Sequence, residues 1–268
     1  IPDSINRSSG PNGAKFIDPI KRTKRIMSSK RLEGRIALIT GASRGIGRAV
    51  ALRFAEEGAT LILVAKSSAG LEEVDDEIRE LTGKTATLVP LDMTKHADID
   101  KLGGSIYERF GKLDILIGNA AILGTLSPMG HIKSRDWLKV MDTNLTANWR
   151  LLRSCDKLLR LSDAGRCVFV TSTVGHVAKA YWSAYAISKA GLEMMTRIYA
   201  EEVASTEIRA NILNPGKTRT TMRESAMPGE DPETLKSPED VTEPFVLLSE
   251  ATCTHNGMMM DEHCDISK

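Results

Sequence analysis

The chain has 268 residues, of which 41% are hydrophobic and 26% charged, an ordinary globular composition that excludes a mainly disordered protein. Its 36 Lys and Arg nearly balance 35 Asp and Glu, so the chain as a whole lacks the basic excess that nucleic-acid binding requires. Four scattered cysteines are too few for a disulfide framework, which favours a reducing, cytoplasmic location. No uncharged apolar run approaches the roughly 18 residues that cross a bilayer, so no membrane partner is expected.

The first 31 residues differ in charge from the rest of the chain. They hold eight Lys or Arg against two Asp and few residues that could form a core. We therefore expect a basic, flexible N-terminal arm over residues 1–31 and one folded domain over residues 32–268. A solvated extension is favoured, while an organelle-targeting segment, a membrane-surface patch and a nucleic-acid tail are the alternatives.

From residue 35 onward, short β-branched runs alternate with amphipathic stretches. The expected strands span residues 35–40, 60–65, 85–91, 114–119, 166–171, 207–213 and, more weakly, 257–261. The expected helices include residues 45–57, 68–81, 95–110 and 134–161. This alternation predicts an α/β fold with a doubly wound parallel sheet of the Rossmann type, in a single domain.

A glycine-rich turn joins the first expected strand to the first expected helix. Glycines allow a tight turn and let backbone N–H groups approach a pyrophosphate at the helix N-terminus. An ordinary loop is the alternative, but the position after the first strand favours a nucleotide-binding turn. The candidate contacts are Gly41, Ser43, Arg44, Gly45, Ile46 and Gly47.

The end of the second expected strand bears on the choice of nucleotide. An NAD site usually places Asp or Glu there to bind the ribose hydroxyls. This chain instead has Lys66 and Ser67, and Arg44 lies in the glycine turn. The absent carboxylate and the two cations favour a 2′-phosphate, so NADP(H) is expected rather than NAD(H), although Lys66 could be an ordinary exposed lysine.

A second cluster follows the fifth expected strand. Ser172 stands at the strand end, and Tyr185 and Lys189 are four residues apart, so they share one face of a helix. A free tyrosine, with a pKa near 10, is a poor acid–base catalyst at neutral pH. An ammonium nearby, together with an oxidised nicotinamide ring, would stabilise the phenolate and lower that pKa. The pattern predicts a Tyr185 that exchanges a proton with a substrate oxygen held by Ser172.

Together these pieces resemble the short-chain dehydrogenase/reductase family, from about residue 32 to residue 261. Further matches are Asp92, residues 118–121, Asn144 and residues 214–216. The resemblance implies catalytic roles for Asn144, Ser172, Tyr185 and Lys189, with Asn144 holding a water that relays protons from Lys189. It also implies that Tyr185 and Lys189 contact the cofactor and that Lys189 clamps the nicotinamide ribose. The other implied cofactor contacts are Asp92, Met93, Asn119, Ala120, Ala121, Pro215, Gly216, Thr218 and Thr220.

Two stretches depart from the family pattern. Residues 118–121 read Gly-Asn-Ala-Ala where the family usually has Asn-Asn-Ala-Gly, so the backbone there could differ slightly. Residues 261–264 read Asp-Glu-His-Cys in place of Asp-Gly-Gly, which puts the final turn in doubt.

The chain looks most similar to bacterial oxidoreductases of the 3-oxoacyl-carrier-protein-reductase-like branch. The expected reaction is hydride transfer between NADP(H) and a carbonyl or secondary alcohol, with a 3-oxoacyl thioester as one possible substrate. Other ketones, sugars or steroid-like compounds, and a catalytically silent NADP(H)-binding regulator, are the alternatives. Arg219 and Arg223, in the expected substrate flap over residues 217–241, form a hypothetical site for an anionic tail, and a solvated helix face is the alternative.

Three smaller expectations complete the interpretation. Tyr181 and Trp182 could wall the pocket, and for Trp182 a packing role is the alternative. A homodimer or homotetramer is expected through the apolar stripes of residues 134–161 and of the helix that follows Tyr185, as is usual in the family. The spacing of Cys253, His255, His263 and Cys264 does not suit a zinc site, so no metal is expected.

Overall fold

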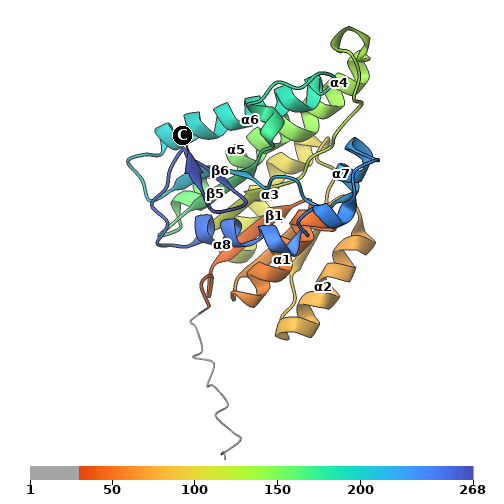
Figure 1. Cartoon of the computed structure of the whole chain (residues 1–268). Coiled ribbons are helices and arrows are strands. Elements are labelled where there is room, and N and C mark those ends of the chain that lie inside the picture. Colours follow the sequence, from red (N-terminus) through yellow and green to blue (C-terminus); the bar gives the residue numbers. More distant parts are fainter. Residues whose placement is uncertain (1–29, 268) are drawn as a thin grey trace, which may run out of the picture.

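In the computed structural model, which describes residues 30–267, one sheet has the strand order β3-β2-β1-β4-β5-β6-β7-β8 (Figure 1). The strands are β1 (Ile36–Thr40), β2 (Thr60–Ala65), β3 (Thr87–Pro90), β4 (Ile115–Gly118), β5 (Arg166–Val170), β6 (Arg209–Asn214), β7 (Met259–Asp261) and β8 (Ile266–Ser267). The pairs from β3 through β7 are parallel, and β8 runs antiparallel to β7. The doubly wound Rossmann-type sheet predicted from the sequence is thereby confirmed.

Helices cover both faces of the sheet (Figure 1). One face packs against α1 (Gly45–Glu56), α2 (Ser68–Thr82) and α8 (Glu243–Ser249). The other packs against α3 (His96–Phe110), α5 (Ala147–Arg160) and α6 (Ser183–Glu202). Along β2, Leu61 and Leu63 belong to the first core and Ile62 and Val64 to the second. Successive side chains of a strand point to opposite faces, and this is why an unbroken apolar run suits a sheet covered on both sides.

The strand order reverses between β1 and β4. β1 pairs with β2 on one side and with β4 on the other, so the chain leaves these two neighbouring strands in opposite directions along the sheet. The loops that follow β1 and β4 therefore diverge at the carboxyl edge, where open α/β sheets bind ligands. The glycine turn and the loop that contains Asn119 both lie at this edge.

The continuous helix expected over residues 134–161 is divided in the structure. α4 (Ser134–Met141) passes into a π-helical turn (Asp142–Thr146) before α5 begins. The turn widens because the N–H of Ala147 donates to the carbonyl of Asp142, five residues back. Asn144 lies in this turn, so the departure from regular helix falls on an expected site residue.

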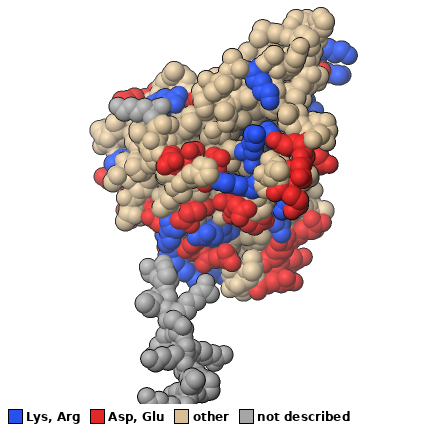
Figure 2. Space-filling model, in the orientation of Figure 1, with Lys and Arg blue, Asp and Glu red and all other residues tan. Residues whose placement is uncertain are grey.

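The folded body begins before residue 32. Arg31 forms ion pairs with Glu243 and Glu250, and Leu32 is fully buried. The remainder of the expected basic arm, residues 1–29, lies outside the described residues. In the orientation of Figure 1, basic and acidic side chains intermix over α1 and α8 (Figure 2), with Arg53 paired to Glu243.

Several large apolar side chains remain exposed on α4, α5 and α6. They are Leu138, Trp149, Ile187, Met194 and Ile198. Part of the two apolar stripes noted in the sequence thus faces away from the sheet. No helix within residues 30–267 has the length and apolar character needed to span a membrane.

Candidate active site

The glycine turn after β1 is shaped by backbone conformation and close packing. Gly41 and Gly45 have φ of +68° and +55°, in the left-handed region that favours glycine. A Cβ on Gly47 would stand 2.6 Å from Asn119 Nδ2 and would overlap the Gly41 carbonyl. α1 can therefore begin close to β1 only with glycine at position 47. Ser43 and Arg44 lie at the tip of the turn, while Ile46 packs against the first core.

Thr40 joins the loops after β1 and β4. Its hydroxyl accepts hydrogen bonds from the backbone N–H groups of Asn119 and Ala120, each at 3.0 Å, and donates to the Ile117 carbonyl at 3.2 Å. The Asn119 amide returns a hydrogen bond to the Thr40 carbonyl at 2.9 Å. Asn119 and Ala120 are thus fixed against the glycine turn, and Ala121 follows them at the same edge.

The departure at Gly118 has a structural reason. A Cβ there would fall 2.5 Å from Asn148 Oδ1 and would overlap the Phe169 ring. These two side chains occupy the space that a larger residue at position 118 would need. The backbone N–H groups of Asn119 and Ala120, directly after Gly118, donate to the Thr40 hydroxyl.

Lys66 and Asp92 meet at the ends of β2 and β3. Lys66 Nζ lies 2.8 Å from Asp92 Oδ2, although 81% of the lysine side chain is exposed. The hydrogen bond from Lys66, followed by that from the Thr94 backbone N–H, holds the pKa of Asp92 well below its usual range. Ser67 caps α2 by accepting from the Gly70 N–H at 3.1 Å. Met93 is buried in the second core, so any contact that it makes with a ligand falls to its backbone.

Ser172, Tyr185 and Lys189 come together where β5 ends beside α6. Tyr185 is 8% exposed and Lys189 2%, and Lys189 Nζ lies 5.7 Å from the centre of the tyrosine ring. The ammonium donates to the Val170 carbonyl at 2.7 Å, which fixes it at the end of β5. Ser172 lies near enough to the Tyr185 phenol to influence its pKa.

Burial controls the protonation of both α6 residues. It raises the pKa of Tyr185 to about 12 and outweighs the opposing effect of Ser172, which lowers that pKa. Burial likewise lowers the pKa of Lys189 to about 8, and the charge of Glu193 opposes that fall. The chain's own groups therefore keep the phenol protonated at neutral pH. The lowering of this pKa by an oxidised nicotinamide ring together with the ammonium stays a prediction.

Asn144 uses its side chain to fix the loop after β4. Its Oδ1 accepts from the Ile122 N–H, and its Nδ2 donates to the Ile122 carbonyl, both at 2.9 Å. Nδ2 also lies 3.0 Å from the Ser188 hydroxyl, one residue before Lys189. With both side-chain atoms engaged, any water that Asn144 holds would bind its backbone. The Asn144 carbonyl also accepts from Asn148 Nδ2 at 2.8 Å.

The turn after β6 is held by its own hydroxyl groups. Thr218 Oγ1 donates to the Pro215 carbonyl at 3.0 Å, and Thr220 caps α7 (Thr221–Ala226) by accepting from the Arg223 N–H at 3.2 Å. The Thr220 methyl group lies over Gly45, which joins this turn to the glycine turn. Gly216, with φ of +64°, packs against the Glu262 carboxylate. Glu262, one of the unusual residues 261–264, thus supports the turn after β6.

The two flap arginines are already neutralised. Arg223 binds Glu230 through both Nε and an Nη atom, and Arg219 Nη1 lies 2.9 Å from Glu233. The structure therefore favours their internal role over the hypothetical anion site. Of the two aromatic residues, Trp182 is 8% exposed and meets Tyr185 edge to face with 6.1 Å between ring centres. Tyr181 is 60% exposed and has φ of +74°.

The sequence interpretation missed Glu193, which lies beside this cluster. The carboxylate is 3% exposed and accepts a hydrogen bond from the Thr171 hydroxyl at 2.6 Å. Its four-residue spacing from Lys189 was the available signal, because that spacing places both on one helix face.

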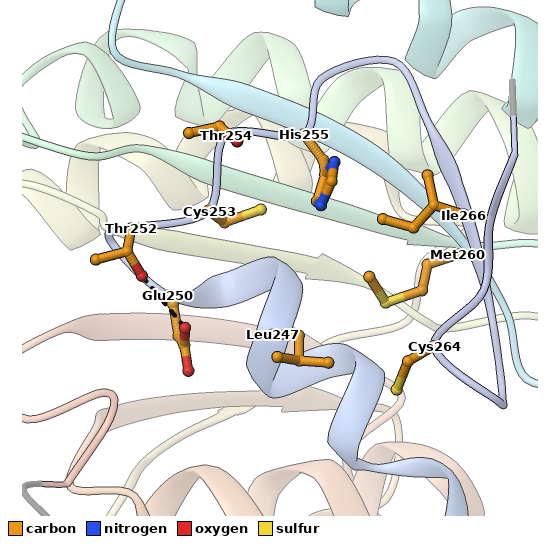
Figure 3. Close-up of a pocket in the computed structure, with 9 residues that line it drawn as sticks. All are labelled: Leu247, Glu250, Thr252, Cys253, Thr254, His255, Met260, Cys264 and Ile266. Atoms are coloured by element: carbon orange, nitrogen blue, oxygen red, sulfur yellow. Dashed lines mark hydrogen bonds between the residues drawn. The ribbon is translucent and has the colours of Figure 1, made fainter.

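A pocket of about 310 Å³ lies among α8, β7 and β8, lined by Cys253, His255, Met260 and Cys264 among others (Figure 3). Thr252, Cys253 and His255 precede β7, whereas the catalytic candidates follow the carboxyl ends of strands, so the two regions are distinct. Within residues 30–267, no group of three or more His, Cys, Asp or Glu side chains is placed to hold a metal ion.

Comparison with known proteins agrees with this geometry. The family profile described as short chain dehydrogenase matches residues 35–231. The uncharacterized oxidoreductase YciK of Escherichia coli K12 is 38% identical over 233 residues, which cover 86% of this chain and 92% of YciK. The 3-oxoacyl-(acyl-carrier-protein) reductase FabG of Vibrio cholerae is 37% identical over 191 residues, which cover 71% of this chain and 76% of FabG.

A solved structure shows the same fold. The crystal structure of a short chain dehydrogenase from Escherichia coli CFT073, complexed with NADPH, matches with a TM-score of 0.85 and 38% identity. The match covers 88% of this chain and 99% of that one. Sequence and structure together establish that the chain is an oxidoreductase belonging to the short-chain dehydrogenase family.

Proposed function

We propose that this protein is an NADPH-dependent carbonyl reductase in which Tyr185 donates a proton to the substrate oxygen. The observation that carries the proposal is the packing of the buried Lys189 ammonium 5.7 Å from the Tyr185 ring, with Ser172 beside the same phenol. A phenol and an ammonium so arranged can act together on an oxygen that gains negative charge during reduction.

The residues present fit a dinucleotide at the carboxyl edge of the sheet. A Cβ on Gly41 or Gly47 would come within 3.0 Å of Asn119 Nδ2, and Gly45 has φ of +55°, so the turn keeps its backbone bare, as close approach of a pyrophosphate requires. The exposed Lys66 suits a 2′-phosphate. On binding, its ammonium would form an ion pair with the phosphate, and its ion pair with Asp92 would weaken. The NADPH complex of a 38% identical relative supports NADP(H) over NAD(H).

The other cofactor contacts follow the same edge. Ser43, Arg44 and Ile46 line the glycine turn, and Asp92, Met93, Asn119, Ala120 and Ala121 follow β3 and β4. Pro215, Gly216, Thr218 and Thr220 follow β6. We assign these residues to the nucleotide, with Tyr185 and Lys189 at its nicotinamide end. When bound, NADPH supplies the hydride that reduces the carbonyl carbon.

The protein's own groups supply the proton and stabilise the negative charge that its transfer leaves on Tyr185. Because the pKa of Tyr185 is raised to about 12, the phenol is protonated at neutral pH and suits the donor role in reduction. Ser172 hydrogen-bonds the same substrate oxygen, and the ammonium of Lys189 stabilises the phenolate that remains. Asn144 positions the loop after β4 through Ile122 and, through its backbone, holds the water that returns a proton toward Lys189.

A 3-oxoacyl thioester is the proposed substrate class, supported by the 37% identity to FabG of Vibrio cholerae. A second candidate, a nucleotide-binding regulator without turnover, has no comparable support, since a sensor needs no buried tyrosine beside an ammonium. Homodimer or homotetramer formation through the exposed apolar residues of α4, α5 and α6, and a cytoplasmic location, also stay proposals.

The test is an assay of NADPH oxidation with a panel of ketones, quinones, sugars and 3-oxoacyl thioesters. We expect turnover with at least one member of the panel and tighter binding of NADPH than of NADH. Binding of NADPH without oxidation across the whole panel would instead favour the regulator, and tighter binding of NADH would refute the cofactor assignment.

Tyr185→Phe is expected to abolish turnover while leaving the NADPH dissociation constant within about twofold, because only the proton donor is removed. Fluorescence titration and steady-state kinetics on the same preparation measure the two quantities. A variant that retains full turnover would exclude the proposed proton donor.

A further inference from the structure

We propose that Glu193 is a positioning residue for the reaction centre: it fixes the turn that carries Ser172, and its negative charge faces the Lys189 ammonium from one helical turn away. The inference rests on the proposed function, because it assigns a task to a residue behind the proposed proton donor. Glu193 touches neither substrate nor cofactor in this scheme and acts through its neighbours.

The carboxylate of Glu193 is enclosed by groups from three segments. Directly after β5, the Thr171 hydroxyl donates to Oε1 at 2.6 Å. From the turn after β5, His176 Nδ1 lies 3.1 Å from the same oxygen. From α6, Arg197 Nη1 lies 3.8 Å from Oε2. A carboxylate with only 3% of its residue surface exposed is costly to bury unless such partners satisfy it, so the cluster defines one arrangement of these segments.

The cluster bears directly on the turn that contains Ser172. A Cβ on Gly175 would stand 2.5 Å from Glu193 Oε1, 2.9 Å from Thr171 Oγ1 and 3.2 Å from Lys189 Cβ. The backbone of this turn is therefore pressed against Glu193 and Lys189 at once. The Gly175 N–H donates to the Ser172 carbonyl at 2.7 Å and closes the turn. A shift of the carboxylate would move the turn, and with it the Ser172 hydroxyl.

The charge of Glu193 also acts on Lys189. Burial lowers the pKa of Lys189 to about 8, and Glu193 opposes that fall. The groups that face Lys189 are the Val170 carbonyl from β5 and Tyr185 and Glu193 from α6. Those that face Glu193 are Thr171, His176 and Arg197. Loss of the Glu193 charge should therefore lower the pKa of Lys189 further, so that the ammonium deprotonates at a lower pH.

Glu193→Gln keeps the size of the side chain and removes its charge. A fall of one unit in the pKa of Lys189 from about 8 would reduce its protonated fraction at pH 8 about fivefold. We expect the alkaline limb of kcat/KM for carbonyl reduction to move to lower pH, with KM for NADPH at pH 6 changed less than about twofold. Glu193→Asp restores the charge and should return the limb toward that of the wild type.

Two further variants separate charge from structure. Thr171→Val removes the hydrogen bond to the carboxylate and keeps the charge, so it should lower kcat without moving the pH limb. Glu202→Gln removes an exposed charge from the same helix and should match the wild type throughout. A Glu193→Gln enzyme with the wild-type pH profile, or a Thr171→Val enzyme with wild-type kcat, would overturn the proposal.

A readout without turnover distinguishes this inference from the proposed function. NMR titration of the lysine ε-carbons in labelled protein, with Lys189→Met for assignment, follows the Lys189 ammonium directly. Its pKa should be lower in Glu193→Gln than in the wild type, and equal values would overturn the inference. Absence of NADPH oxidation in the wild type would remove the proposed function while this titration still tested the link between Glu193 and Lys189.

Discussion

Gly47→Ala is expected to destabilise the protein and weaken its binding of NADPH. The added methyl group would stand 2.6 Å from Asn119 Nδ2 and would overlap the Gly41 carbonyl, so α1 must move away from β1. Overpacking of this kind costs about 1–3 kcal/mol. Displacing Asn119 would also strain its 2.9 Å hydrogen bond to the Thr40 carbonyl, worth about 1 kcal/mol.

The sum is a sizeable part of the roughly 5–15 kcal/mol that stabilises a typical domain. In a protein of this size, the melting temperature falls by about 2–4 °C for each kcal/mol lost. Thermal unfolding with and without NADPH measures both consequences, because a ligand that binds only the folded state raises the melting temperature more the more tightly it binds. We expect a lower melting temperature and a smaller increase on addition of NADPH.

Gly104→Ala serves as the matched control. Gly104 lies in α3, is exposed, and a Cβ there would meet no atom within 4 Å. Alanine in a helix interior should stabilise the protein by about 0.5–1 kcal/mol. If Gly47→Ala unfolded at the wild-type temperature and bound NADPH with wild-type affinity, the close approach of α1 to β1 would be refuted.

Two further predictions concern charge. Burial alone would raise the pKa of Asp114, but hydrogen bonds from Lys112, Ser162 and the Ile36 N–H outweigh it and hold that pKa below its ordinary value. A lowered carboxyl pKa stabilises the folded state above the unfolded value near 4, and this stability is lost as the pH falls through the folded value. Asp114→Asn should therefore be less stable than the wild type at pH 7 and should lose less stability as the pH falls. Urea unfolding between pH 3 and 7 measures this. Equal dependence of the unfolding free energy on pH in the two proteins would contradict it. Arg223→Ala should release Glu230 and make residues 217–241 more sensitive to proteases, with KM for an anionic thioester changed less than about threefold. A rise of about tenfold in that KM, absent for a neutral ketone, would restore the anion-site hypothesis.

The sequence predicts the sheet well because its strands carry a local signal. Residues buried on both faces form apolar runs such as Leu61–Val64, and glycines that must lie against a neighbouring backbone leave a recognisable turn. β8 was missed because Ile266–Ser267 is too short to show a period and is defined only by pairing with β7. The π turn at Asn144 was missed for a similar reason, since it depends on contacts with Ile122 rather than on the helical pattern.

The candidate site was harder to predict than the fold because partners distant in sequence decide what each charge does. Lys66 was expected as a cation for a phosphate, but its contact with Asp92 depends on the pairing of β2 with β3. Likewise, nothing in the spacing of Arg219 and Arg223 reveals Glu233 and Glu230 as their partners. The direction of the pKa shift at Tyr185 depends on its burial, which a motif does not encode.

The glycine at position 118 restricts how this chain can change. Phe169 and Asn148 fill the volume beside it, so the asparagine usual in the family cannot be reintroduced by one substitution. A viable path would first need smaller or reoriented residues at both of those positions, and each of these intermediates would leave a void. A larger residue at position 118 therefore requires changes at both Asn148 and Phe169, and this coupling, rather than the backbone conformation, keeps glycine there.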